Sequence, residues 1–411
     1  MSENRLSIYV PAAAIAIVAV VAGWVATSSL QQDLAAYWVA GAARRAGLDP
    51  YVNHVGSVAA PELWDGVAVF AHSRFLYPPI VAELFRGLAF LPYPAAKLVF
   101  TLGMVAAWAG AAVVTARGVG GRRALAVALG AGALFYPLYL ALERGQIDPL
   151  VLLLLVVAFG ARRPGAAGAA LAAAAALKPA LAGTIVVLTA LGRWRVVAVA
   201  LAGFAVVVVA CVVVSGPALT REYATRVLPR ASLYGEGGDE SMLLPPERLL
   251  AHADDLEAGV ARVGGRAYPV AAWDRPASAS VPRLLAPRGP TPLTSRAPGL
   301  VALALLAAAA LGVRRRGSAA GDALVPWAAA VACVVASPAG WVMGLVVALP
   351  LACWLARLRD ARRAPGWSLA VVVTLVACAV PPPVAGWAAL AGAGLCVATA
   401  GLALALPPEA A

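Results

Sequence analysis

Apolar runs separated by short polar turns occupy most of the chain. A helix needs about 20 apolar residues to cross the hydrocarbon core of a bilayer, so most of these runs are predicted to be membrane-spanning helices. Three runs, 79–91, 166–177 and 179–191, are short and are expected to be tilted, broken or re-entrant. The first run follows only Arg5 and lacks a convincing small-residue cleavage site, which predicts a retained first helix. The runs fall at about residues 8–27, 79–91, 95–116, 124–142, 148–161, 166–177, 179–191, 196–214, 298–313, 321–337, 341–356, 367–380 and 384–406.

Many of the arginines lie in short loops between these runs. Short cytoplasmic loops of membrane proteins collect Lys and Arg, and one alternating topology puts all the clusters on the cytoplasmic side. Parity then predicts about 12 crossings, a half-inserted helix at 79–91, and both termini in the cytoplasm. The clusters are Arg5, Arg117/Arg122/Arg123, Arg162/Arg163, Arg193/Arg195, Arg314/Arg315/Arg316 and Arg357/Arg359/Arg362/Arg363.

Two connections on the opposite, outer side are too long to be simple turns. Residues 28–78 contain a helix-like stretch, Asp33–Ala46, and residues 215–297 carry nearly balanced acidic and basic charge. Long loops in compact proteins usually carry function. We therefore expect a single membrane domain over residues 1–411, with a first outer catalytic loop at 28–78 and a large outer loop or lid at 215–297.

Composition supports an all-α polytopic membrane protein. The 411 residues are 62% apolar and 13% charged, whereas soluble domains are about half apolar and a quarter charged. These values exclude a water-soluble enzyme, a disordered tail and a disulfide scaffold. The net charge of +12 comes with the loop arginines that orient helices, so nucleic acid is not an expected partner. The cysteines lie inside apolar runs and are expected to be buried hydrophobes; they are Cys211, Cys333, Cys353, Cys378 and Cys396.

Asp33 is the first residue with candidate chemistry. It follows two glutamines just beyond the first apolar run, and Tyr37 and Trp38 come four and five residues later. A carboxylate at the membrane boundary can serve as a general base on a hydroxyl, and the aromatic side chains can stack on a sugar. The alternative is an N-cap, in which Asp33 only satisfies backbone N–H groups at a helix start.

Lys178 is the sharpest anomaly in the chain. It lies between two short apolar runs whose far ends both carry cytoplasmic arginines. A charge at this depth costs several kcal/mol unless it is paired or lines a wet cavity, which favours a functional role. A lysine near the outer leaflet suits the phosphate of a lipid-linked donor. Snorkelling of the side chain to the surface is the alternative.

The outer hairpin at residues 143–149 is more polar than a turn requires. Arg144 can meet a phosphate with two parallel hydrogen bonds, and Gln146 follows it closely. The alternative is a plain ion pair of Arg144 with Glu143 or Asp148.

Three further residues are weaker candidates. Tyr77 precedes two prolines that are typical of a helix start, and His72 lies close to it in the sequence. Trp341, after the Ser337-Pro338 turn, has the character of an interfacial tryptophan. No His/Cys metal spacing, phosphate-binding glycine loop or nucleophile elbow is present.

Taken in order, these motifs resemble the polytopic C-type (GT-C) glycosyltransferases that use polyprenyl-phosphate sugars. The chain is most similar to glycosyltransferase family 87, the actinobacterial polyprenol-phosphate-mannose-dependent mannosyltransferases, over about residues 5–360. Each motif is weak alone, but their order is moderately specific. The motifs are Asp33, Gly47-Leu48-Asp49-Pro50-Tyr51, Tyr77-Pro78-Pro79, Gly145-Gln146, Leu177-Lys178-Pro179 and Ser337-Pro338 with Trp341.

The resemblance implies a GT-C-like bundle and an inverting sugar transfer from a polyprenyl-phosphate donor to an envelope glycolipid or glycan. Asp33 would be the catalytic base, and Lys178 and Arg144 would meet the donor phosphate. Membrane lipids are the other expected partners, at an extracytoplasmic active site of the plasma membrane. No cofactor is predicted, and the sequence leaves a divalent metal open. The expected substrate-binding residues are Tyr37, Trp38, Tyr77, His72, Gln146 and Trp341.

Two other functions stay open at this point. A transporter or lipid flippase would also use Lys178 and Arg144, although no internal repeat of transporter type is evident. An inactive relative that serves as a scaffold is the other, because Val342, Met343 and Gly344 follow Trp341 where relatives commonly carry acidic and histidine residues. The sugar, the acceptor, the linkage and the oligomeric state do not follow from the sequence.

Overall fold

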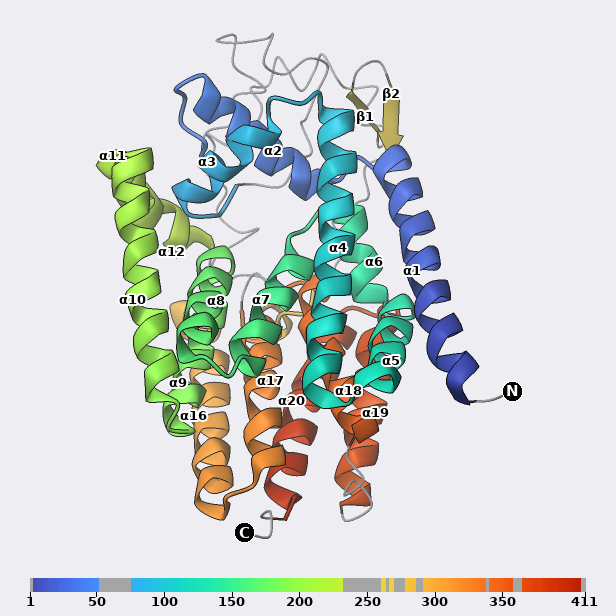
Figure 1. Cartoon of the computed structure of the whole chain (residues 1–411). Coiled ribbons are helices and arrows are strands. Elements are labelled where there is room, and N and C mark those ends of the chain that lie inside the picture. The colour runs from blue at the N-terminus through green and yellow to red at the C-terminus, as the bar shows by residue number, and fades with distance from the viewer. Residues whose placement is uncertain are drawn as a thin grey trace.

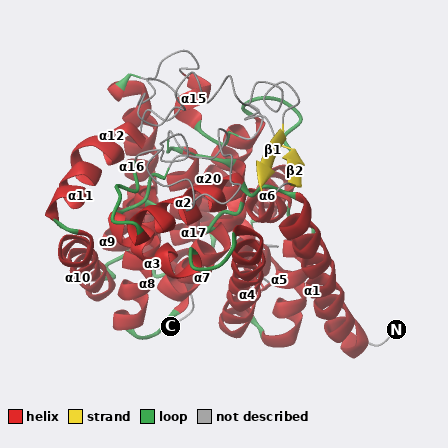
Figure 2. Ribbon diagram, turned by 90° about the horizontal axis from the view of Figure 1, so that it is seen from above, coloured by secondary structure: helices red, strands yellow, loops and turns green. Residues whose placement is uncertain are grey.

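The computed structural model is a helical bundle with a short helical layer across one end. Figure 1 shows helices α2 and α3 at the top, above the bundle, and Figure 2 shows the same layer from above. The structure describes residues 3–51, 75–231, 260–263, 266–269, 278–285, 291–337, 340–357 and 364–407. The expected helical class is therefore confirmed, apart from one small β-hairpin.

The elements follow one another along the chain with short connections. The hairpin pairs β1 (Val260–Val263) with β2 (Arg266–Pro269) in antiparallel register. Short 3-10 segments, η3 (Pro179–Gly183) and η8 (Val342–Ala348), precede α9 and α18, and π-helical turns, η4 (Cys211–Ser215) and η5 (Tyr223–Val227), follow α10 and α11. The α-helices are α1 (Glu3–Ser28), α2 (Gln32–Arg45), α3 (Pro79–Leu88), α4 (Tyr93–Val119), α5 (Gly121–Ala133), α6 (Tyr136–Arg144), α7 (Asp148–Gly160), α8 (Pro164–Leu177), α9 (Thr184–Ala190), α10 (Trp194–Ala210), α11 (Pro217–Glu222), α12 (Leu228–Ala231), α15 (Val281–Leu285), α16 (Pro292–Arg316), α17 (Ala319–Val335), α18 (Leu349–Arg357), α19 (Pro365–Ala379) and α20 (Trp387–Ala405).

Several helices are long and apolar enough to cross a membrane. Within the described residues there are five such helices, in α1, α4, α10, α16 and α20, and a sixth span if α5 and α6, bent by 60°, form one crossing. Further apolar helices of 10–17 residues lie beside them. The protein is therefore a multi-pass membrane protein, while the number of about 12 crossings stays a prediction.

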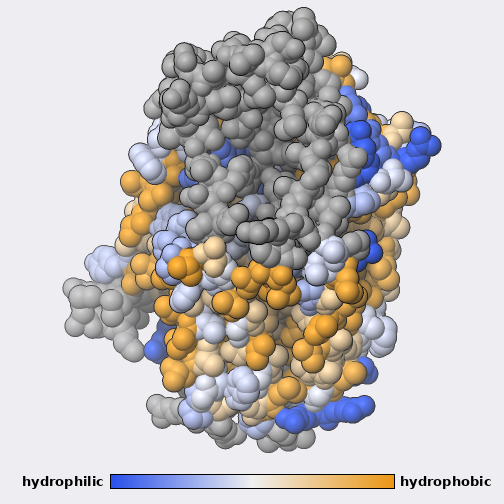
Figure 3. All heavy atoms as spheres, turned by 180° about the vertical axis from the view of Figure 1, so that it is seen from behind, coloured by the Kyte–Doolittle hydropathy of each residue, from blue (hydrophilic) through white to orange (hydrophobic). Residues whose placement is uncertain are grey.

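The surface of the bundle fits lipid as its solvent. Figure 3 shows hydrophobic residues over the middle of one face. On α10 and the η4 turn that follows it, Val206 and Val213 expose 66% and 76% of their surface, more than isolated surface hydrophobes explain. All five cysteines are buried and free, as the sequence predicts.

The basic loops gather at the end of the bundle opposite α2 and α3. Arg193 forms an ion pair with Asp322 at 2.5 Å and donates to the carbonyl of Phe159, near the end of α7. A Cβ placed on Gly192 would lie 2.7 Å from Cζ of Arg314. We call this region, with loops 162–163, 193–195 and 314–316, the arginine end. Figure 1 shows the first turn of α1 and the last turn of α20 on the side away from α2 and α3.

The long outer connections are only partly described. In the first, α2 covers the helix-like stretch expected from Asp33, and residues 52–74 lie outside the described residues. In the second, α11 and α12 follow α10, and α16 begins at Pro292, so helices occupy both ends of residues 215–297. Helix α3 has ten residues, about 15 Å, which is too short to cross a hydrocarbon core about 30 Å thick.

Helices α2 and α3 pack tightly because a glycine lies between them. A Cβ on Gly41 would lie 2.5 Å from the carbonyl oxygen of Phe85. Near this contact, Arg44 pairs with Glu83 at 2.7 Å. Residues 32–43 of α2 are all buried, so α2 is enclosed even though it lies at the end of the bundle.

We expect Gly41→Ala to separate α2 from α3. The new methyl group would meet backbone rather than a flexible side chain, and overpacking of this kind destabilises by about 1–3 kcal/mol. Thermal unfolding in detergent should show a lower Tm for this variant. Gly103→Ala on α4, where a Cβ would meet nothing within 4 Å, should leave the Tm unchanged or raise it slightly. Equal Tm values for the two variants would contradict the close packing.

Candidate active site

Asp33 lies in the first turn of α2 and is buried. The residue that caps α2 is Gln31, whose backbone is left-handed with φ 55° and ψ 64°. Asp33 is therefore two residues past the cap, and its interpretation as an N-cap is wrong. A carboxylate in the first turn interacts favourably with the positive end of the helix dipole.

Two tyrosine hydroxyls and one amide meet beside Asp33; we call Tyr37, Tyr77 and Gln146 the hydroxyl–amide cluster. The hydroxyls of Tyr37 and Tyr77 are 2.7 Å apart. Tyr37 donates to Oε1 of Gln146 at 3.0 Å, and Tyr77 lies 3.4 Å from the same oxygen. The tyrosine rings meet edge to face, with centroids 5.0 Å apart. Three residues that are distant in the sequence thus form one polar surface.

Tyr37 acts as a neutral hydroxyl. Burial raises its pKa well above the ordinary value, and the nearby Tyr77 and the carboxylates of Asp33 and Asp148 raise it further. The hydroxyl therefore stays protonated at neutral pH and is available as a hydrogen-bond donor.

Gly145 explains how the turn between α6 and α7 reaches α2. Its backbone is left-handed with φ 70°, a conformation that favours glycine. A Cβ here would lie 2.6 Å from Cβ of Leu34 and 3.0 Å from Cβ of Gln31. Only glycine allows this approach, which puts the next residue, Gln146, beside Tyr37.

Lys178, at the end of α8, pairs with Asp148, the first residue of α7. Its Nζ lies 2.8 Å from Oδ1 and 3.0 Å from Oδ2 of the carboxylate. Asp148 is 1% exposed, so the pair is largely removed from water on the carboxylate side. This pairing, rather than snorkelling to the surface, is what the structure shows for Lys178.

Arg144 is buried at the end of α6 and makes an ion pair with Glu143, Nε to Oε2, at 3.3 Å. It also donates to Oε1 of Gln32, the first residue of α2. The alternative of an ion pair with Glu143 is therefore confirmed, whereas Asp148 pairs with Lys178 instead.

One predicted aromatic residue, Trp38, contacts a different part of the structure. Trp38 donates from Nε1 to the carbonyl of Leu91 at 3.1 Å and meets Tyr93 edge to face. It therefore faces the connection between α3 and α4, not the hydroxyl–amide cluster. Trp341 forms an isolated antiparallel bridge with Ser278. His72 lies outside the described residues.

The apolar residues after Trp341 lie close to the ion pair. Val342 and Met343 are buried. A Cβ on Gly344 would lie 3.8 Å from Oδ1 of Asp148. The turn after α17 and the start of α7 therefore meet at the same place.

A set of polar side chains on α4 was not predicted from the sequence. Tyr93, Lys97 and Thr101 follow one another at intervals of four residues, and all contact the connection between α1 and α2. Lys97 is only 1% exposed. The signal was available, because Lys97 is one of only two lysines in the chain and lies in an apolar run.

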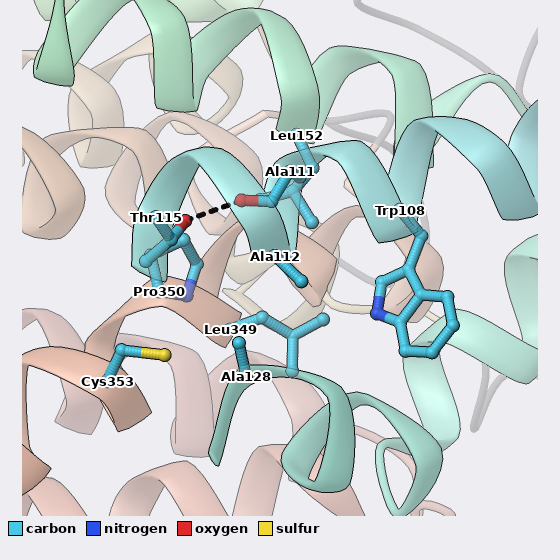
Figure 4. Close-up of a pocket in the computed structure, with 9 residues that line it drawn as sticks. All are labelled: Trp108, Ala111, Ala112, Thr115, Ala128, Leu152, Leu349, Pro350 and Cys353. Atoms are coloured by element: carbon cyan, nitrogen blue, oxygen red, sulfur yellow. Dashed lines mark hydrogen bonds between the residues drawn. The ribbon is translucent and has the colours of Figure 1, made fainter. Parts of the chain in front are cut away.

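A pocket in the bundle interior does not belong to this site. Figure 4 shows its lining, which carries no charged side chain. The hydroxyl of Thr115 donates to the carbonyl of Ala111, within the same helix, at 2.8 Å. The lining residues are Trp108, Ala111, Ala112, Thr115, Ala128, Leu152, Leu349, Pro350 and Cys353. None of the candidate site residues lines this pocket.

Metal ligands do not cluster in the described part of the chain. No group of three or more His, Cys, Asp or Glu side chains comes together there. The three histidines, His54, His72 and His252, are all outside it.

Comparison with known proteins decides the family. A model described as glycosyltransferase family 87 matches residues 75–338, which is more than half of the chain. The chain belongs to glycosyltransferase family 87. It is therefore a membrane glycosyltransferase, and the resemblance to this family is confirmed. No curated protein and no solved structure matches the chain.

The family 87 match covers most of the candidate site. Tyr77, Arg144, Gln146 and Lys178 lie within the matched residues, Asp33 precedes them and Trp341 follows them. The hydrogen bond from Tyr37 to Gln146 joins the residues that precede the family match to the matched residues.

We expect Tyr37→Phe to reduce sugar transfer about tenfold in this glycosyltransferase. Loss of the hydroxyl breaks the cluster and leaves the Gln146 amide free to turn. The matched control is Tyr139→Phe, which also removes a tyrosine hydroxyl, here one that donates a part-buried hydrogen bond to the carbonyl of Ala133. Both variants should lose about 1 kcal/mol of stability. Only Tyr37→Phe should lose transfer, measured with purified enzyme; equal transfer by the two variants would contradict a role for the cluster.

Proposed function

We propose that this family 87 glycosyltransferase moves mannose from a polyprenyl-phosphate donor to a glycolipid or glycan acceptor of the cell envelope. The observation that carries the proposal is the burial of Asp33 at the start of α2, one helical turn before Tyr37 of the hydroxyl–amide cluster. A carboxylate, sugar-binding polar groups and two cations then lie within one region of the protein.

Asp33 is proposed as the general base. The proton of the acceptor hydroxyl passes to its carboxylate while the acceptor oxygen attacks the anomeric carbon in line. The bond between that carbon and the phosphate oxygen breaks, and its electron pair leaves with polyprenyl phosphate. The configuration at the anomeric carbon inverts. A base must lie within hydrogen-bond reach of the proton it takes, which the boundary position of α2 favours.

The donor phosphate is proposed to bind at Lys178 and Arg144. Each cation has a carboxylate partner, Asp148 and Glu143 respectively, so the site is close to neutral before the donor binds. A phosphodiester carries a single negative charge and can share these cations without bringing a large excess of charge. Hydrogen bonds from charged donors are the strong ones, and they stabilise the phosphate as it leaves.

The hydroxyl–amide cluster is proposed to bind the sugar. Tyr37 and Tyr77 offer hydroxyl groups and ring faces, and Gln146 offers an amide. Side chains of these types suit the alternating hydroxyl and apolar surfaces of a hexose. Through Tyr37 the cluster is attached to the helix that carries Asp33, and through Gln146 it is attached to the turn before Asp148, the partner of Lys178.

The membrane boundary is proposed as the place of reaction because the donor has a lipid tail. Basic loops of membrane proteins face the cytoplasm, and here the arginine end lies opposite α2. We therefore propose that both termini are cytoplasmic and that the reaction takes place on the outer side of the plasma membrane.

We expect Asp33→Asn to reduce transfer from polyprenyl-phosphate mannose to a small residual rate, because the amide keeps the shape of the side chain but cannot accept the proton. A loss of at least 10²-fold fits removal of a general base. The matched control is Asp322→Asn at the arginine end, which removes a carboxylate from an ion pair away from the site. This control should keep its transfer rate. Undiminished transfer by Asp33→Asn would remove Asp33 as the base.

A further inference from the structure

Three side chains on one face of α4 contact the connection between α1 and α2. Tyr93, Lys97 and Thr101 are spaced four residues apart, which puts them above one another on the same side of a helix. We call them the α4 stripe. The segment they contact, residues 29–31, joins the end of α1 to the start of α2.

Each member of the α4 stripe contacts a different part of this segment. Lys97 donates to the carbonyl of Ser29, and the Tyr93 hydroxyl donates to the carbonyls of Leu30 at 2.5 Å and Gln31 at 3.1 Å. The amide of Gln31 donates to the hydroxyl of Thr101 at 2.8 Å. Every residue of the connection is therefore bonded to α4.

Burial of the Lys97 ammonium at this position is unfavourable in free energy. Its side chain is 1% exposed, and a buried ammonium in a membrane helix is tolerated only with strong partners. The Ser29 carbonyl follows the last residue of α1, where the helix dipole is negative. A cation is therefore stabilised here in a way that a neutral donor would not be.

The connection needs such contacts because its geometry is unfavourable. Gln31 has φ 55°, a left-handed conformation that persists in a non-glycine residue only when its surroundings determine it. Two hydrogen bonds to the end of α6 also fix this connection. The Gln31 amide donates to the carbonyl of Leu142 at 2.9 Å, and the Ser29 hydroxyl donates to the carbonyl of Glu143 at 2.8 Å.

We propose that the α4 stripe, with Lys97 as its charged member, is a positioning device for Asp33. It fixes the turn two residues before that carboxylate and so sets where α2 presents it. Lys97 touches neither donor nor acceptor and acts through the backbone of residues 29–31. This inference rests on the proposed role of Asp33 as the base.

The test compares Lys97→Met and Lys97→Arg with wild type in steady-state transfer from polyprenyl-phosphate mannose. Lys97→Met keeps the length of the side chain and removes the charge. We expect kcat to fall about 30- to 100-fold, since a misplacement of about 1 Å can cost that much, with the donor KM changed less than about twofold. Lys97→Arg should recover part of kcat. A purely structural role would reduce the amount of folded enzyme and leave kcat per folded molecule unchanged.

Two control variants lie on the same helix. Leu98→Ala alters a side chain that is 48% exposed on the outside of α4, and Thr115→Val removes a hydroxyl 18 residues away, about 27 Å along the helix. Both should keep the wild-type kcat. If Lys97→Met does not fold, Tyr93→Phe tests the same stripe by removal of one hydroxyl, with the same expected split between kcat and KM.

A double-mutant cycle separates this inference from the proposed function. In an Asp33→Asn background, Lys97→Met should reduce the residual transfer no further, because groups that act through one another are not additive. A full additional loss, or a wild-type kcat for Lys97→Met beside an inactive Asp33→Asn, would overturn the positioning role alone. Normal transfer by Asp33→Asn would overturn the proposed base, and the positioning role with it.

Discussion

A lysine ammonium at the end of a membrane helix requires a counter-charge, and in this protein Asp148 supplies it. Removing one member of a buried ion pair is far more damaging than removing both, so α7 and α8 must meet where Lys178 reaches the carboxylate. Because α7 begins at Asp148, its position also determines the preceding turn. Gly145 in that turn contacts α2, and Gln146 reaches Tyr37. One electrostatic constraint thus connects the middle of the bundle to its end layer.

Helix α2 is held from two sides by polar contacts in apolar surroundings. The α4 stripe binds the carbonyls before it, and the end of α6 binds Gln31 and Gln32. A buried polar group without a hydrogen bond costs free energy, so these hydrogen bonds stabilise the position of α2. The result is a short, buried helix whose first turn carries a carboxylate. The proposed base is therefore held on a helix whose position is fixed by its neighbours.

The sequence predicted what depends on local pattern. The apolar runs predicted the long membrane helices and marked Lys178 as an anomalous charge, and the order of weak motifs indicated the family. The sequence after residue 31 predicted helix α2. Which carboxylate pairs with a given lysine depends on tertiary packing, so the ion pair between Lys178 and Asp148 could not be predicted from the sequence. The interpretation of Asp33 as an N-cap failed because Gln31 takes a left-handed conformation that only the surrounding contacts explain. Lys97 lies inside one long apolar run, whereas Lys178 separates two short ones, and the contact of Lys97 with Ser29 forms only in the folded chain.

The most direct measurement of the central claim compares Lys178→Met, Asp148→Asn and the double variant for both Tm in detergent and sugar transfer. Each single change leaves a charge or an acceptor without its partner and should lower the Tm strongly. The double variant should recover most of the Tm, because neither member of the pair then remains alone, yet it should stay inactive because the proposed phosphate site has lost its ammonium. A double variant as unstable as the two single effects added together would contradict the pairing. Normal transfer by the double variant would contradict the role of Lys178 in donor binding.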